Sequence, residues 1–284
     1  MEMKTAVIID GCRTAVGSMG GSLKPLSAYD LACAVMKGEL DRTGIDPKQI
    51  DEVIMGQCRQ TSDEPNIARV AALKVGIPES ASAHTVMRQC ASGMTAVQNG
   101  AMQIMTGVSD VVLAGGTESM SNAVFYLRNA RYGVGTGNTE LVDAVTEGQF
   151  RSQPQEMYGR YNMGATAEKI AETLGITREQ QDEFSMESQR RAIAAIDAGK
   201  FKDEIVPVTV PQGRKKPPIV FDTDEFPKRD TSLEKMGKLK PCFNIVTEDD
   251  GRIFNTSELT GTVTAASSSG RNDGASAMLL MSEE

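Results

Sequence analysis

Apolar residues in the first 120 positions follow two patterns that alternate along the chain. Short apolar or β-branched runs predict strands at 5–10, 53–56, 82–86 and 110–116. Apolar residues three or four positions apart predict helices that begin near Ala28, Ile67 and Cys90. Strands that alternate with helices in this way indicate an α/β layer architecture.

The pattern changes after residue 120. Residues 121–160 are polar and glycine-rich and carry no clear period. Helical spacing returns at 163–174, and residues 177–180 have the composition of a capping box for a second helix that runs to about residue 198. Residues 205–210 predict a strand that contains a proline, which indicates an edge position.

The end of the chain returns to the first pattern. Residues 261–265 are small or β-branched, and residues 276–281 predict a further strand. We therefore expect one α/β domain formed by residues 1–120 and 251–284. A helical and loop-rich domain, residues 121–250, is expected as an insertion into it.

Cys90 occupies the most suggestive position for chemistry. It follows the predicted strand 82–86 and opens a predicted helix, so it lies where free backbone N–H groups and the positive end of the helix dipole favour an anion. A cysteine in such a place can act as a nucleophile. Residues 91–93 are Ala, Ser and Gly, which leave room for a substrate carbonyl. The alternative is that Cys90 is an ordinary buried small hydrophobic residue.

Composition narrows the function classes. The 284 residues carry a formal net charge of −8, which argues against nucleic acid or an anionic membrane as the main partner. Five cysteines without a C-x-x-C pair suit free thiols in a reducing cytoplasm, and we expect no leader or membrane-spanning segment. His84 is the single histidine, so we expect no metal site.

Six segments, in order, carry a resemblance to a known family. They are Arg13-Thr14 with 20–23, Arg88-Gln89-Cys90-Ala91-Ser92-Gly93, Ala114-Gly115-Gly116-Thr117-Glu118-Ser119-Met120-Ser121, 163–168, 181–184, and 261–265 through 272–275. Together they resemble the thiolase family, which comprises acetyl-CoA acetyltransferases and 3-ketoacyl-CoA thiolases. The motif at 114–120 favours thiolases over the condensing enzymes of fatty-acid and polyketide synthesis.

The resemblance implies a fold and a reaction. The expected fold is one α/β half of the layered thiolase architecture, with a mixed five-stranded sheet and an inserted loop domain. The expected reaction is ping-pong acyl transfer between coenzyme A thioesters, in which Cys90 takes the acyl group and a deprotonated second thioester attacks the acyl-enzyme. Coenzyme A thioester is the substrate, and no resident cofactor is expected.

The resemblance also implies coenzyme A contacts. Met163 matches a loop-domain methionine near the pantetheine, and Ala265 and Ser269 match positions that line the same arm. Lys228 and Arg229 match a basic pair, one member of which contacts the nucleotide end. An equally weighted alternative is that Lys228 and Arg229 form a solvated charged pair.

Three motifs of the family are missing from this sequence. They are the Gly-His-Pro histidine that activates the nucleophile, the Asn-Glu-Ala-Phe motif that holds an oxyanion-hole water, and the Cys-x-Gly-Gly acid/base cysteine. His84 is a poor substitute because six residues of strand separate it from Cys90 by about 20 Å, at roughly 3.3 Å per residue. A packed or interface histidine is the preferred interpretation of His84.

Further departures concern substrate binding. The family's Gly-Asn-Ala-Ser-Gly is replaced here by residues 266–270, Ala-Ser-Ser-Ser-Gly, and its loop-domain histidine is replaced by Asn162. Residues 245–260 are additional relative to the family pattern. These changes bear on the choice of acyl-CoA and leave Cys90 in place.

The favoured hypothesis is a split thiolase, in which this chain carries the nucleophile and a separate polypeptide carries the C-terminal half. The second hypothesis is a non-catalytic acyl-CoA-binding or scaffold subunit, and the third is a fragment of a full thiolase. The resemblance also implies pairing of residues 82–87 with a second copy, so both homo- and hetero-oligomers are expected.

Overall fold

The computed structural model describes residues 3–243 and 261–284, and these divide into two compact units. The first unit comprises residues up to 123 together with 200–226 and 271–284. The second comprises 124–199 and the described part of 227–270. Residues 245–260, which the sequence marked as an addition, lie outside the described residues.

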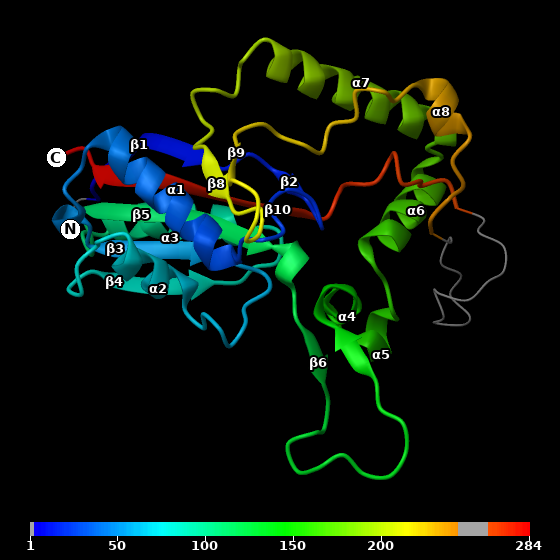
Figure 1. Ribbon diagram of the computed structural model, residues 1–284, viewed down its shortest axis with the longest axis horizontal. Helices are drawn as coiled ribbons and strands as arrows, with labels where there is room; N and C mark the ends of the chain where they lie inside the picture. The colour runs from blue at the N-terminus through cyan, green and yellow to red at the C-terminus, as the bar shows by residue number, and fades with distance from the viewer. Residues whose placement is uncertain (1–2, 244–260) are drawn as a thin grey trace. The chain divides into compact units, whose positions relative to one another are not determined.

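A mixed sheet forms the centre of the first unit (Figure 1). Its strands are β1 (Ala6–Arg13), β2 (Gly17–Ser18), β3 (Glu52–Gly56), β4 (Ser82–Val86), β5 (Val111–Ser119) and β10 (Asn272–Ser282). The order is β1-β10-β5-β3-β4, with the two-residue β2 paired to β10. β10 is antiparallel to β1 and β5, whereas β3 is parallel to β4 and β5. The expected mixed sheet with five main strands is confirmed.

Helices cover both faces of this sheet. α1 (Ala28–Thr43) and α2 (Ile67–Lys74) pack on one face, where Val53 and Met55 of β3 point. α3 (Ser92–Met105) packs on the other face, against Ile54. Alternate residues of β3 therefore pack into cores on opposite faces of the sheet. This explains why the strand is an uninterrupted apolar run. Two short 3-10 helices, η1 (Pro47–Gln49) and η2 (Met120–Asn122), complete the connections.

Residues 200–226 belong to the α/β unit, although the sequence pattern assigned them to the insertion. The backbone of Arg13 exchanges hydrogen bonds of 2.8 Å with Glu204 and Val206, and its guanidinium pairs with Asp224 at 2.7 Å. The small hairpin of β8 (Val208–Val210) and β9 (Ile219–Phe221) packs into the same core as α1. These contacts join positions about 200 residues apart, so no local pattern could indicate them.

The second unit is mainly helical. Its elements are β6 (Phe125–Leu127), β7 (Leu141–Asp143), α4 (Ala144–Phe150), α5 (Gln155–Tyr158), α6 (Met163–Leu174), α7 (Arg178–Asp197) and α8 (Leu233–Gly237). The capping box expected at the start of α7 is present, with Thr177 and Gln180 bonding to each other's backbone N–H groups. Residues 262 and 263 also belong here, since their N–H groups donate to the carboxylate of Glu168.

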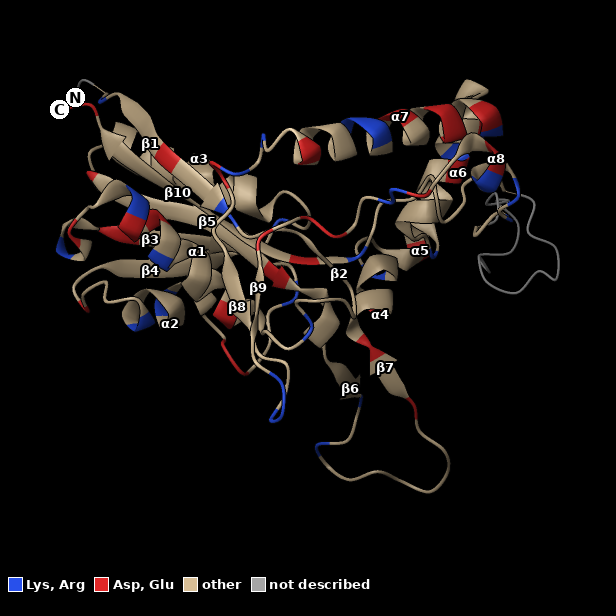
Figure 2. Cartoon of the chain, turned by 45° about the horizontal axis from the view of Figure 1, so that its top comes forward, with Lys and Arg blue, Asp and Glu red and all other residues tan. Residues whose placement is uncertain are grey.

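In the described part of the chain, basic and acidic residues occur along both units (Figure 2). The clearest basic group on the first unit is the loop between β8 and β9, which contains Arg214, Lys215 and Lys216. Among the described residues, no helix is long and apolar enough to cross a membrane.

Candidate active site

Cys90 lies on the turn between β4 and α3 and is exposed. α3 begins two residues later, at Ser92, and its N-cap residue Ala91 provides no side-chain hydrogen bond. No side chain therefore caps α3, and the positive end of its dipole favours an anion that forms near the turn. Cys90 occupies the position that the sequence pattern predicted for it.

The turn before Cys90 has an unusual and well-fixed backbone. Gln89 has a φ of 50°, in the left-handed region that few side chains adopt without compensation. Its carbonyl oxygen accepts hydrogen bonds from the N–H and the hydroxyl of Ser92, at 3.0 and 2.6 Å. The same hydroxyl accepts the N–H of Arg88 at 2.8 Å. Ser92 thus holds both residues that precede the cysteine.

A cavity of about 340 Å³ opens beside Cys90. It lies where β3, β5 and β10 meet the turn, and residues of the first unit alone line it. Besides Cys90, its polar or reactive lining includes Gln57, Cys58, Gln89, Ser92 and Glu118. Cys58 and Glu118 were not among the predicted site residues, although they lie at the ends of β3 and β5, whose carboxyl ends meet at this edge.

Glu118 brings a buried carboxyl group to this cavity. One oxygen, Oε2, accepts the N–H of Cys58 at 2.9 Å, while Oε1 is buried with no hydrogen-bond partner in the described part of the chain. Burial raises the pKa of the Glu118 carboxyl, and the nearby N–H groups of Cys58 and Arg59 offset part of that effect. Glu118 therefore holds its proton more readily than an exposed glutamate does.

His84 does not belong to this cavity. It lies on β4, and its Nδ1 is 2.7 Å from Oε1 of Glu52 on the neighbouring strand β3. This contact supports the interpretation of His84 as a packed histidine. Within the described ranges, no group of three or more His, Cys, Asp or Glu side chains could hold a metal ion.

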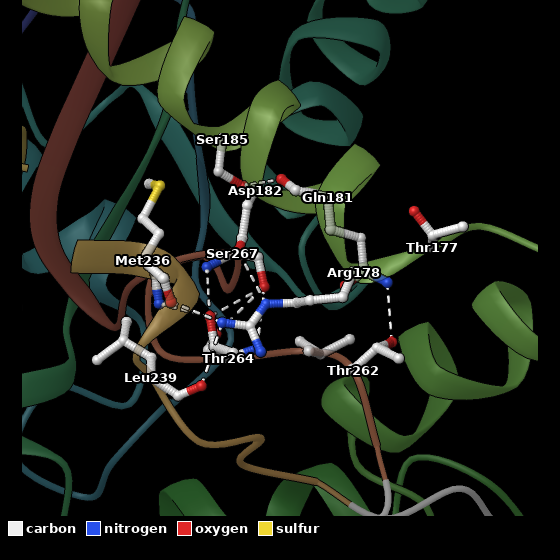
Figure 3. Close-up of polar contacts among 12 residues, drawn as sticks. Thr177, Arg178, Gln181, Asp182, Ser185, Met236, Leu239, Thr262, Thr264 and Ser267 are labelled. Atoms are coloured by element: carbon white, nitrogen blue, oxygen red, sulfur yellow. Dashed lines mark hydrogen bonds and ion pairs between the residues drawn. The ribbon is translucent and has the colours of Figure 1, made fainter. Parts of the chain in front are cut away.

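Met163, Ala265 and Ser269 lie in the second unit. Met163 is the first residue of α6 and is exposed. Asn162, which replaces the family's histidine, caps that helix by accepting the N–H of Ala165 at 2.8 Å. Ala265 follows Thr264, whose N–H and carbonyl bind the hydroxyls of Ser267 and Ser268. Figure 3 shows this serine-rich turn beside the contacts of Arg178.

Arg178, at the start of α7, makes several hydrogen bonds within the second unit. Its guanidinium donates to Asp182 at 2.8 Å and to the carbonyl oxygens of Met236 and Leu239 at 2.6 and 3.1 Å (Figure 3). Gln181 on the same helix donates to the hydroxyl of Thr262 at 2.8 Å. The bonds of Arg178 and Gln181 therefore join α7 to residues 236–239 and to Thr262, whereas the 264–268 turn is held by its own Thr264, Ser267 and Ser268 contacts.

Lys228 and Arg229 also belong to the second unit. The Arg229 guanidinium forms two hydrogen bonds to the Asp197 carboxylate, at 2.7 and 3.0 Å, and both side chains are exposed. The sequence alternative was a solvated pair formed by Lys228 and Arg229, whereas the structure pairs Arg229 with Asp197 at the surface. A nucleotide phosphate would compete with Asp197 for Arg229, and the coenzyme A contacts of all five matched residues stay predictions.

Comparisons with known proteins agree with this architecture. The family model described as "Thiolase, N-terminal domain" matches residues 6–284. An acetyl-CoA acetyltransferase of Cupriavidus necator is 44% identical over 281 residues, which cover 99% of this chain and 66% of that relative. Among solved structures, the Bacillus anthracis acetyl-CoA acetyltransferase has a TM-score of 0.89 at 40% identity. Human mitochondrial 3-ketoacyl-CoA thiolase has a TM-score of 0.86 at 35% identity.

These structural matches cover 99% of this chain and 66% of each relative, so the chain spans slightly less than two thirds of their length. The family model and the identities above 30% agree with each other. The chain belongs to the thiolase family and corresponds to its N-terminal domain.

Proposed function

We propose that this chain is the nucleophile-bearing part of a thiolase that transfers acetyl or acyl groups between coenzyme A thioesters. The observation that carries the proposal is the placement of Cys90, which is exposed at the start of α3 and lines a cavity. Membership of the thiolase family supports the reaction class.

Cys90 performs the covalent half of the proposed reaction. Its thiolate attacks the thioester carbonyl carbon, and the negative charge of the tetrahedral intermediate develops on the carbonyl oxygen. The N–H of Cys90 is one candidate donor to that oxygen, and the free end of α3 favours the charge. Coenzyme A thiolate then leaves, and the acyl group stays on Cys90. The enolate of a second thioester attacks this group, forms the 3-ketoacyl-CoA and releases the thiolate.

The two proton transfers require groups beyond those at the cavity. The single histidine of the chain contacts Glu52, and the cavity lining includes no histidine. We therefore assign activation of Cys90, and the acid/base step at the α-carbon, to a second polypeptide that carries the Gly-His-Pro and Cys-x-Gly-Gly motifs.

The outer face of α3 supports the need for a covering partner. Met94 is 64% exposed and Met102 is 55% exposed, and they lie eight residues apart on the same side of the helix, with Gln98 between them. The two methionines form a short exposed apolar stripe, interrupted by Gln98, which fits a surface that another protein layer covers. Within the described ranges, β4 pairs with β3 on one side and is an edge strand of the main sheet, which fits pairing with a second copy of the chain.

The proposal is tested by turnover with and without the partner. Acetyl-CoA and coenzyme A are supplied to this chain alone, to the candidate partner alone and to the mixture. We expect thiolase turnover in the mixture and in neither component alone. Equal, negligible turnover in all three would favour the non-catalytic acyl-CoA-binding subunit. The cytoplasmic location expected from the sequence stays a prediction.

A further inference from the structure

A second thiol lies beside the turn that carries Cys90. Cys58 follows the carboxyl end of β3 and lines the same cavity as Cys90. Its Sγ donates a hydrogen bond of 2.9 Å to the carbonyl oxygen of Gln89 and lies 3.8 Å from the hydroxyl of Ser92. The thiol therefore contacts the peptide group that joins Gln89 to Cys90. Because that peptide group leads directly to the Cα atom of Cys90, the two thiols are neighbours at this turn.

The other cysteines have different surroundings. Cys12 is buried in the main core and donates to the carbonyl of Val35, and Cys33 packs against the same core. Cys242 is exposed but belongs to the second unit. Among the described residues, Cys58 and Cys90 are the thiols that line the cavity. Their pairing is thus specific to this site.

The environment of Cys58 keeps it protonated in the resting protein. Burial raises the pKa of the Cys58 thiol, and the nearby Glu118 and Cys90 charges add to this effect, although the hydrogen bond with Ser92 opposes it. A protonated thiol does not attack thioesters, so Cys58 does not compete with Cys90 for the acyl group. It remains available for a reaction with an oxidised Cys90.

We propose that Cys58 is the resolving thiol of Cys90, and that a peroxide converts the two into a reversible disulfide. The Cys90 thiolate attacks one oxygen of hydrogen peroxide, the O–O bond breaks, and Cys90 sulfenic acid and hydroxide form. The Cys58 proton then passes to the sulfenic oxygen as the Cys58 sulfur attacks the sulfenic sulfur as a thiolate, the S–O bond breaks, and the oxygen leaves as water. In total, two thiols and one hydrogen peroxide give one disulfide and two water molecules.

The disulfide would block the nucleophile and also protect it. Oxidation of an unprotected cysteine continues to sulfinic acid, which simple thiols do not reduce. Once bonded to Cys58, the sulfur of Cys90 is returned to the thiol by a dithiol reductant. The pair therefore predicts an inactivation by peroxide that is reversible.

Peptide mapping tests this inference without any need for thiolase activity. The full chain is treated with hydrogen peroxide, free thiols are alkylated, and the protein is digested without reduction. We expect a cross-linked peptide pair that contains Cys58 and Cys90, accompanied by an intact-mass loss of two hydrogens. Dithiothreitol should restore alkylation at both positions. Sulfinic acid at Cys90 with no Cys58–Cys90 cross-link would overturn the proposal.

Three variants sharpen the test. In Cys58→Val, the cross-link is lost and the share of Cys90 that dithiothreitol recovers falls several-fold, because oxidation proceeds to sulfinic acid. Cys58→Ser provides the same comparison with a smaller change in the cavity, in case the valine variant folds poorly. Cys33→Ser is the matched control and should retain the cross-link. Equal recovery of Cys90 in the wild-type chain and both Cys58 variants would refute a resolving role.

Discussion

Gly56 at the end of β3 lies directly against the backbone of Ser92 at the start of α3. A Cβ atom on Gly56 would come within 2.3 Å of the Ser92 carbonyl carbon and 2.4 Å of the Gly93 nitrogen. Backbone atoms of a helix start cannot move aside as a flexible side chain does. The absence of a side chain at Gly56 therefore allows α3, and with it Cys90, to lie close to the sheet.

Gly56→Ala tests this close approach. We expect a loss of about 1–3 kcal/mol in the free energy of unfolding, because the added methyl overpacks a site bounded by backbone. The rate of Cys90 alkylation by iodoacetamide should change in the same variant, since the turn must shift. Gly93→Ala is the matched control, because a Cβ there would lie 3.9 Å from its nearest neighbours. Equal stability of the two variants in urea unfolding would contradict the account.

Glu39 provides a prediction on pH. This residue of α1 is fully buried, and burial raises the pKa of its carboxyl, with Asp10 adding to the effect and Cys12 opposing it. Because the pKa of Glu39 is higher in the folded than in the unfolded state, protonation of this carboxyl stabilises the fold. This contribution is fully present below the pKa of an unfolded glutamate, about 4.3. That contribution is lost as pH rises through the raised pKa of Glu39.

Glu39→Gln should remove this dependence. The neutral amide mimics the protonated acid at every pH, so the stability of the variant relative to the wild type should increase from pH 4 to pH 8. Urea unfolding at several pH values measures the difference. Asp41→Asn, at an exposed position of the same helix, is the control. A stability difference that stays constant or shrinks over this range would show that Glu39 is not held protonated.

Substitutions of Arg229 and Asp197 test whether the Arg229 guanidinium binds the nucleotide end of coenzyme A or only forms a surface ion pair. If Arg229 contacts the nucleotide end of coenzyme A, Arg229→Ala should raise the KM for acetyl-CoA several-fold with little change in kcat. Asp197→Asn should lower the KM for acetyl-CoA, because the Arg229 guanidinium then lacks its carboxylate partner. Neither change should alter stability much, since exposed ion pairs contribute little. An unchanged KM in both variants would leave Arg229 as a solvated charge.

Met102 tests the covering of α3 by a partner. Met102→Glu places a charge on the exposed apolar stripe without disturbing the core face of the helix. We expect unchanged circular dichroism and at least a ten-fold weaker association with the polypeptide that carries the missing motifs, because a buried unpaired charge is costly. Lys48→Glu, at an exposed position outside this stripe, should bind normally. Normal binding by Met102→Glu would place the partner elsewhere.

Local patterns predicted the parts of the fold that depend on local physics. The apolar runs gave β3 and β4, and the capping residues Thr177 and Gln180 gave the start of α7. The position of Cys90 followed from the same strand-to-helix pattern. Each of these features is decided by residues within a few positions of one another.

Contacts between distant residues could not be predicted. Nothing near Asp224 indicates that it pairs with Arg13, so residues 200–226 were assigned to the wrong part of the chain. Cys58 carries no local signal of chemistry, because its role depends on the approach of the turn at Gln89. The buried oxygen of Glu118 is visible only once β3 and β5 are aligned.

Acylation of Cys90 is the most direct measure of the proposed chemistry. The complex of this chain with the partner is mixed with acetyl-CoA, quenched in acid and mapped by mass spectrometry. We predict one acetyl group on this chain, located at Cys90 and absent from the Cys90→Ser variant, while Cys242→Ser is labelled as the wild type is. Acetylation that persists in Cys90→Ser, or an unlabelled Cys90 in a complex that turns over, would contradict the assignment of Cys90 as the nucleophile.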